Sequence, residues 1–265
     1  MLLFKLLITP VLMGVSTLVA RQWGPVVGGI FTALPMTAAP VSVFLYLEQG
    51  SDFAQSAACA SMLGYAALGF FILAFVRIAQ WGKGWGLACC VSSCTYFAFA
   101  WLFSFLPRHG LLCLVLSVVC LLWVLQCIPR SSGHWEAPRA AWWDLPGRMI
   151  VAGGLVLGIT GLAELIGPRW SGFLSTFPVF ITLMAIFTLA QAGVADLCML
   201  MRGFVGGMFG SLAFFFVLQM ALPVMHPAGA YALSAVVNLV ICGADLWFSS
   251  HSLRALQQLL RARGK

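Results

Sequence analysis

The sequence predicts an all-α, polytopic integral membrane protein with about nine transmembrane helices, arranged as two inverted four-helix repeats joined by a connecting helix. The prediction depends on an apolar composition, a recurring pattern of glycine and proline, and an uneven distribution of basic residues. Of the 265 residues, 62% are hydrophobic and 8% are charged, and the mean hydropathy is +1.01. Soluble domains carry about 25% charged residues, so this chain is too apolar to cover a surface that faces water.

A stretch rich in glycine and proline occurs twice. Residues 24–50, GPVVGGIFTALPMTAAPVSVFLYLEQG, align without a gap to residues 167–193, GPRWSGFLSTFPVFITLMAIFTLAQAG. The matched pairs are Gly24 with Gly167, Pro25 with Pro168, Gly29 with Gly172, Pro35 with Pro178, Gly50 with Gly193, Gly64 with Gly207 and Gly86 with Gly229. A series of such matches in one register predicts an internal duplication.

Nine apolar segments are long enough to cross a bilayer, whose core takes roughly 20 residues of helix. They are residues 2–20, 25–47, 53–78, 86–105, 111–128, 149–165, 168–190, 197–222 and 228–248. The first segment also has features of a signal peptide, with Lys5 inside it and Arg21 directly after it. Its partner in the second repeat, residues 149–165, is internal, which favours a retained span.

One long polar stretch separates the two halves. Residues 129–148, PRSSGHWEAPRAAWWDLPGR, contain proline, glycine, serine and charges of both signs, which is typical of a linker. Trp135, Trp142 and Trp143 indicate that it lies against the lipid headgroups. The predicted organisation is a first four-span repeat over residues 1–106, a connecting helix and cytoplasmic linker over 107–148, a second repeat over 149–250, and a basic cytoplasmic tail over 251–265.

The basic residues divide unequally if the nine segments alternate in direction. One side receives Arg21, Arg77, Lys83, Arg130, Arg139, Arg148, Arg202, Arg254, Arg261, Arg263 and Lys265, and the other receives Lys5, Arg108 and Arg169. Because cytoplasmic loops are rich in Lys and Arg, the N-terminus is predicted outside and the C-terminus in the cytoplasm. The second repeat begins five spans after the first, an odd number, so the repeats are predicted to be inverted.

Pro35 and Pro178 interrupt equivalent apolar segments. Proline costs roughly 3 kcal/mol in a helix interior, and lipid offers no water to the carbonyl groups that it frees. Hydroxyl side chains accompany the two prolines: Thr32, Thr37, Ser175, Thr176 and Thr182. Corresponding interruptions in two halves favour a transporter's substrate site at these residues. In the alternative, the prolines merely kink packed helices and the hydroxyls satisfy the freed backbone.

Three further polar residues lie within or beside the apolar segments. Asp245 and Asn238 occupy the last segment, and an ionisable group inside a span is often functional, so Asp245 is a candidate proton or cation acceptor. In the alternative it reaches interfacial water or pairs with Arg202. Glu48 ends the second segment and is either a solvated loop acid or part of an ion-coupling vestibule that attracts cations. Asn238 is grouped with the substrate-binding residues.

Other motifs are assigned to packing or exclude functions. Gly203, Gly206, Gly207 and Gly210 form two overlapping GxxxG patterns, which favour close helix packing. The nine cysteines are interpreted as small buried hydrophobic residues. The sequence contains no CxxC, HExxH, GxSxG or Walker motif, so no metal, cofactor or enzymatic activity is predicted. No basic run is interleaved with aromatic residues in a polar setting, so no nucleic-acid partner is predicted.

The second repeat, IGPRWSGFLSTFPVFITLMAIFTLAQAGVADL, resembles GlpM-like bacterial inner-membrane proteins of four spans. The resemblance depends on Gly172, Phe177 and Pro178, followed by Gly193 and Asp196, and it covers about 100 residues. It implies a chain in which two such units are fused in opposite orientation and inserted in the bacterial inner membrane. The family has been linked to cell-envelope polysaccharide production, and it supplies no substrate or catalytic residues.

The expected function is a secondary transporter or flippase for a small or amphipathic, lipid-like molecule, coupled to protons or cations. A mostly apolar pathway with a few hydroxyls suits a weakly polar cargo better than a highly charged one. The expected partners are membrane lipids, the cargo and a second copy in a homo-oligomer. The alternative is a membrane protein that transports nothing and supports cell-envelope assembly.

Overall fold

The computed structural model describes residues 2–35, 38–107, 109–131, 147, 150 and 178–263. Its helices are α1 (Leu2–Trp23), α2 (Pro25–Thr32), α3 (Ala38–Gln49), α4 (Ser51–Gln80), α5 (Trp85–Phe103), α6 (Gly110–Cys127), α9 (Val179–Ala221) and α10 (Pro227–Arg263). Within these ranges all regular structure is helical, which confirms the all-α prediction for this part of the chain.

Among the residues that the structure describes, five helices are long and apolar enough to cross a membrane, at Ser51–Gln80, Trp85–Phe103, Gly110–Cys127, Phe180–Ala221 and Pro227–Trp247. The described residues therefore fit a helical membrane protein but not the predicted count of nine spans. The predicted segment 149–165 lies outside them, except for Ile150. The predicted segment 25–47 is divided between two short helices, and segments 168–190 and 197–222 merge into α9.

The predicted break at Pro35 is present in the backbone. Helix α2 ends at Thr32, and α3 begins at Ala38. With 8 and 12 residues, the two helices are about 12 Å and 18 Å long, shorter than the roughly 30 Å of a bilayer core. Pro25 stands at the start of α2, where its missing N–H costs no hydrogen bond.

Single glycines make the turns between several consecutive helices. Gly24, Gly50 and Gly193 have φ angles of 91°, 84° and 85° and ψ angles of 169°, −179° and −173°. This backbone region is essentially restricted to glycine. Gly50 donates its N–H to the Tyr46 carbonyl (2.9 Å) and accepts from the Ala54 N–H (3.2 Å). Gly193 likewise divides α9 into a helix over 179–192 and a longer one over 194–221.

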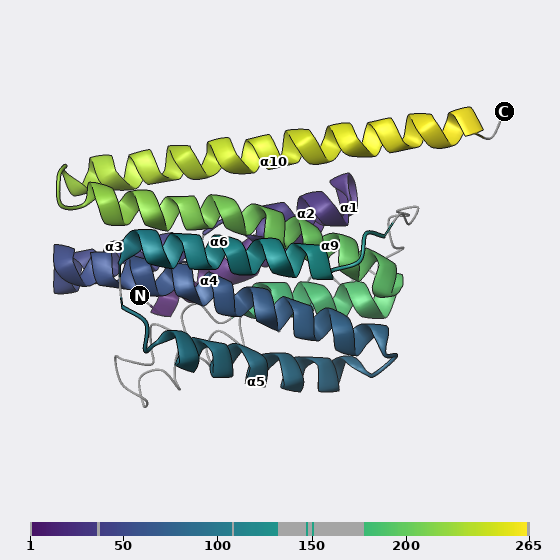
Figure 1. Ribbon diagram of the computed structural model, residues 1–265, viewed down its shortest axis with the longest axis horizontal. Helices are drawn as coiled ribbons and strands as arrows, with labels where there is room; N and C mark the ends of the chain where they lie inside the picture. Colours follow the sequence, from purple (N-terminus) through teal and green to yellow (C-terminus); the bar gives the residue numbers. More distant parts are fainter. Residues whose placement is uncertain are drawn as a thin grey trace.

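The long helices lie side by side along the long axis of the molecule (Figure 1). Helix α4 runs from the left-hand end to the right, α5 returns, and α6 runs to the right again. Residues 194–221 of α9 run to the left, and α10 returns to the right, where the chain ends. The α4–α5 turn, the end of α6, Gly193 and the C-terminus therefore share the right-hand end.

Helices α4 and α9 supply much of the buried core. Met62, Phe71 and Phe75 of α4 are completely buried, and so are Met208 and Leu218 of α9. Helix α9 packs against α2, α4, α6 and α10, whereas α3 packs against α4. The residues predicted to form a separate tail, 251–265, instead continue α10 without interruption as far as Arg263.

Candidate functional site

The longer part of α9 approaches two neighbouring helices through two rows of glycine. Gly203 and Gly207 face α2: a methyl group on Gly207 would lie 2.7 Å from the Ile30 carbonyl oxygen and 2.8 Å from the Ala33 Cβ. Gly210 faces α10, where the same methyl would lie 2.5 Å from the Cys242 Sγ. These contacts confirm the close packing that the GxxxG patterns predict, and they leave no room for side chains between the helices.

The broken end of α2 is held by a side chain of α9. The Ser211 hydroxyl donates a hydrogen bond of 2.6 Å to the Ala33 carbonyl, just before the break at Pro35. Ser211 is completely buried, and the hydroxyl of Tyr65 in α4 lies within hydrogen-bonding reach of it. The break is therefore in contact with polar groups from α4 and α9. Sequence reasoning missed Ser211, although a serine beside Gly210 in an apolar segment was the available signal.

The threonines predicted to face a ligand bond instead to their own helices. The Thr32 hydroxyl donates to the Gly28 carbonyl (2.7 Å), and the Thr182 hydroxyl donates to the Pro178 carbonyl (2.6 Å). Such bonds to the carbonyl four residues earlier are common for threonine in helices. Pro178 is buried and caps the start of α9. The predicted site residues Thr37, Ser175 and Thr176 lie outside the described residues.

Helix α10 turns a row of polar side chains toward α9. Ser234, Asn238 and Cys242 are buried, and Asp245 follows on the same face at helical spacing. The Cys242 thiol lies 3.7 Å from the Gly207 carbonyl oxygen and 3.8 Å from the Asn238 Oδ1. Asp245 Oδ2 lies against Gly206. The row extends from Ser234, about 10 Å inside α10, toward the right-hand end of that helix.

Two atoms in this row are buried and make no hydrogen bond: Asn238 Nδ2 and Asp245 Oδ2. An unsatisfied buried polar group costs about 1–3 kcal/mol, and more when it is charged. Buried polar atoms are nearly always paired in folded proteins, so these two mark a candidate site. Among the described side chains, Gln219 Oε1 and Tyr231 Oη are also buried without a partner. The row on α10 and the broken end of α2 both border residues 207–211 of α9. We call this region the central polar site.

Arg202 does not pair with Asp245, so that half of the alternative is wrong, and contact of Asp245 with interfacial water stays a prediction. The Arg202 Nη1 donates to the Leu125 carbonyl (2.7 Å) and the Ile128 carbonyl (2.6 Å), at the end of α6. Arg202 thus binds carbonyl groups that the helix leaves unpaired at its C-terminus. Among the described side chains, no cation forms an ion pair with Asp245, and its Oδ2 accepts no hydrogen bond.

The predicted coupling residue Glu48 lies away from Asp245. It occupies the last turn of α3, next to Gly50 at the left-hand end, whereas Asp245 lies 18 residues into α10 as that helix runs to the right (Figure 1). Asp196, which the site prediction omitted, is 8% exposed in the first turn after Gly193. A carboxylate at this position is of the sign that the N-terminus of a helix attracts.

The described residues contain no group of three or more His, Cys, Asp or Glu side chains that could hold a metal ion.

Comparison with known proteins adds no relative: no family model, no curated protein and no solved structure matches the chain. The resemblance to GlpM-like proteins therefore stays a prediction. Fold and site together define a helical membrane protein whose described part carries a polar site between tightly packed helices.

Proposed function

We propose that this chain is a secondary transporter or flippase that moves a small or amphipathic, lipid-like molecule through the central polar site. The observation that carries the proposal is that two buried atoms on the face of α10 toward the glycines of α9, Asn238 Nδ2 and Asp245 Oδ2, have no hydrogen-bond partner. A protein with only a scaffolding role gains nothing from leaving such atoms unsatisfied. In a transporter they are the groups that cargo and coupling ion satisfy during the cycle.

An inverted duplication of the four-span unit supports this function. Gly50 and Gly193, which are equivalent in the repeat alignment, share one unusual backbone conformation. Helices α4 and α5 run in the opposite directions to their equivalents, residues 194–221 and α10 (Figure 1). Transporters built from inverted repeats bind substrate near the bilayer midplane, at broken helices where the two halves meet. The break at Pro35 contacts Ser211 of the second half, as that architecture requires.

The chemistry of the central polar site favours a cargo with few polar groups. Its described polar groups are the Tyr65 and Ser211 hydroxyls, the Asn238 amide and the Cys242 thiol, and the helices around them are apolar. A neutral hydrogen-bonding group fits such surroundings, because burying a charge without a partner is costly. An amphipathic molecule would place its polar part here and its apolar part between the helices.

Asp245 is the coupling residue in this proposal. Its Oδ2 is held against Gly206 in an apolar helix interface, so neutralisation by a proton or cation strongly favours its burial. The neutral Asp245 side chain would favour close packing of α9 and α10, and the charged side chain would oppose it. Glu48, in the last turn of α3, remains a candidate for attracting cations at the opposite end.

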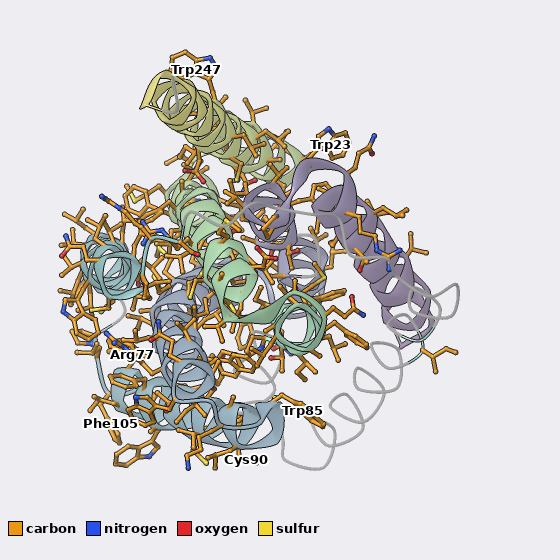
Figure 2. All side chains as sticks on the ribbon, turned by 90° about the vertical axis from the view of Figure 1, so that its right-hand side faces the viewer. Trp23, Arg77, Trp85, Cys90, Phe105 and Trp247 are labelled. Carbon is orange, nitrogen blue, oxygen red and sulfur yellow. The ribbon has the colours of Figure 1, made fainter. Side chains whose placement is uncertain are left out.

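The proposed location is the bacterial inner membrane, with the right-hand end of Figure 1 in the cytoplasm. Arg77, Arg130 and Arg202 gather at that end, around the C-terminus of α6. Figure 2 views it directly and shows Trp23, Trp85 and Trp247 on the outside of the bundle, where they are 61%, 56% and 56% exposed. Tryptophan is enriched where helices meet the lipid headgroups, so this ring supports an interface there.

The second candidate is a membrane protein that supports envelope assembly without transport. It is favoured by the internal hydrogen bonds of Thr32, Thr182 and Ser211, which occupy the hydroxyls that a cargo would otherwise use. In that case replacing Asp245 or Asn238 would change stability alone.

Reconstituted vesicles separate the two functions. The protein is placed in liposomes that contain a fluorescent phosphatidylethanolamine and an internal pH dye, and lipid exchange and proton flux are recorded under a pH gradient. We expect the wild-type protein to accelerate both, and Asp245→Asn to reduce the proton flux to the level of protein-free vesicles. Asp52→Asn is the matched control, because Asp52 is an exposed acid in the first turn of α4. Equal flux through both variants, at equal folded yield, would reject the coupling role. A wild-type protein that moves neither probe would favour the second candidate.

A further inference from the structure

Two arginines from different helices converge on the C-terminal end of α6. The Arg77 Nη2 of α4 donates to the Cys127 carbonyl (3.3 Å), and the Arg202 Nη1 of α9 donates to the Leu125 and Ile128 carbonyls. Arg130 follows two residues after Ile128 and lies within electrostatic range of Arg202. Two guanidinium groups therefore bind one turn of backbone at the end of α6, and the charge of the third, Arg130, acts on Arg202. We call the three residues the arginine cluster.

The arginine cluster carries an excess of positive charge. The C-terminus of a helix supplies about half a negative charge, which is far less than three cations require. Among the described side chains, the Asp52 carboxylate belongs to the opposite end of the molecule, and the Asp196 and Asp245 carboxylates form no ion pair with Arg77, Arg130 or Arg202. Like charges brought together in this way call for an anion that binds them.

The cluster also retains free hydrogen-bond donors. A guanidinium group has five N–H donors, and the described bonds use one nitrogen of Arg77 and one of Arg202. Arg77 and Arg130 are exposed, so their remaining donors are accessible from outside the helix bundle. Figure 2 shows Arg77 at the end of the molecule that faces the viewer, on the side of α4 toward α6. Bidentate recognition by arginine suits the oxygens of a phosphate group.

We infer that the arginine cluster binds the phosphate of an anionic phospholipid and clamps α4, α6 and α9 together at the cytoplasmic interface. A lipid is favoured over a soluble anion because the cluster lies at the same end as the exposed Trp81 and Trp85, which mark the depth of the headgroups. Basic pockets between membrane helices on the cytoplasmic side bind acidic headgroups in this way. The inference concerns a second site and does not depend on transport.

The test compares lipid binding by matched charge variants of the full chain. The protein is reconstituted in nanodiscs of phosphatidylcholine with and without phosphatidylglycerol, and Tm and the phosphatidylglycerol retained in native mass spectrometry are recorded. Arg130→Gln removes one cation without breaking a described bond to α6, and Lys83→Gln removes an exposed cation in the nearby α4–α5 turn. We expect phosphatidylglycerol to raise the Tm of the wild-type protein. Arg130→Gln should retain phosphatidylglycerol about fivefold more weakly than the wild-type protein, whereas Lys83→Gln should retain it as the wild-type protein does.

Each other outcome overturns the inference. Equal loss of retention in both variants would mean diffuse attraction between a basic surface and acidic lipid. An equal fall in Tm with and without phosphatidylglycerol would mean that Arg130 is bound by another part of the chain. Stabilisation of the detergent-solubilised protein by inorganic phosphate, lost in Arg130→Gln, together with no preference for phosphatidylglycerol, would assign the site to a soluble anion.

Discussion

At Gly207 the absence of a side chain determines how closely α9 approaches α2. The Ile30 carbonyl and the Ala33 Cβ lie where a methyl group would stand, at 2.7 Å and 2.8 Å. Backbone cannot yield as the end of a long side chain can, so an added methyl would push the two helices apart. The Ser211 bond to Ala33, one turn further along α9, would be stretched with them.

Gly207→Ala is therefore expected to lower the free energy of unfolding by about 1–3 kcal/mol, the usual cost of overpacking. Gly243→Ala is the matched control in α10, because a Cβ there meets nothing within 4 Å. Replacing a glycine inside a helix by alanine in open space should raise stability by up to about 1 kcal/mol. Thermal unfolding in detergent measures both, and a destabilisation by Gly243→Ala as large as that by Gly207→Ala would contradict the packing argument.

At the scale of the elements, one-residue turns join α3 to α4 and the two parts of α9. Neither Gly50 nor Gly193 has any atom within 4 Å of its would-be Cβ, so space does not explain the glycine at these positions. The backbone conformation explains the glycine, because φ angles of 84° and 85° with an extended ψ are strained for residues that have a Cβ. The acids Asp52 and Asp196, in the first turn after each glycine, then favour the start of the next helix.

Gly50→Ala and Gly193→Ala should each destabilise the protein by about 1–3 kcal/mol, although both substitutions point into open space. Gly84→Ala in the α4–α5 turn tests the cause, since Gly84 also has open space but a φ of −60° that alanine adopts freely. We expect its unfolding temperature to match that of the wild-type protein. A loss of stability in Gly84→Ala similar to the other two would show that flexibility, rather than φ, matters at these turns.

At the scale of the whole molecule, the alternation of helices brings distant basic residues to one end. Arg77, Arg130 and Arg202 are far apart in the sequence, but the C-terminus of α6 gathers them. The positive-inside rule treats such residues only as a count on one side of the membrane. In the folded chain, two of them also satisfy carbonyl groups that α6 leaves unpaired, so one set of residues serves orientation and packing.

Single cysteines test this arrangement in intact cells. Lys83 and Asp52 are exposed at opposite ends of α4, so Lys83→Cys and Asp52→Cys should react with an impermeant maleimide from opposite sides of the membrane. In the parent protein for both variants, the exposed Cys90 and Cys94 are first replaced by serine. We expect Asp52→Cys to be labelled in whole cells and Lys83→Cys only after permeabilisation. Labelling of both from the same side would reject the topology.

The sequence predicted the features that depend on local chemistry. The break at Pro35, the close contacts of Gly207 and Gly210, and the bounds of α4 and α6 to within a few residues all follow from proline, glycine and apolar length. Which helices contact one another could not be predicted from the sequence. The serine that holds the break, Ser211, lies 178 residues from its partner Ala33. No periodicity in the chain indicates which apolar face meets which.

The partner of Arg202 could not be predicted for the same reason, and its pairing with Asp245, one of the alternatives, is not formed. Its position before Gly203 gave only its side of the membrane, and a nearby carboxylate was the obvious partner. In the folded protein the carbonyls at the end of α6 are the better match, because they offer two acceptors to one nitrogen at 2.6 Å and 2.7 Å. Asn238 and Asp245 remained predictable as unusual residues, since polarity in an apolar segment can be seen without any contact map.

Helices α2 and α3, which divide one predicted span between them, pack against different neighbours. Helix α2 is locked by backbone contact to α9, and α3 rests on α4. If α9 shifts past α4, the segment cannot move as a single rod, because each piece follows its own neighbour. We expect such a displacement to change the angle between α2 and α3, next to the Ala33 carbonyl that the Ser211 hydroxyl binds.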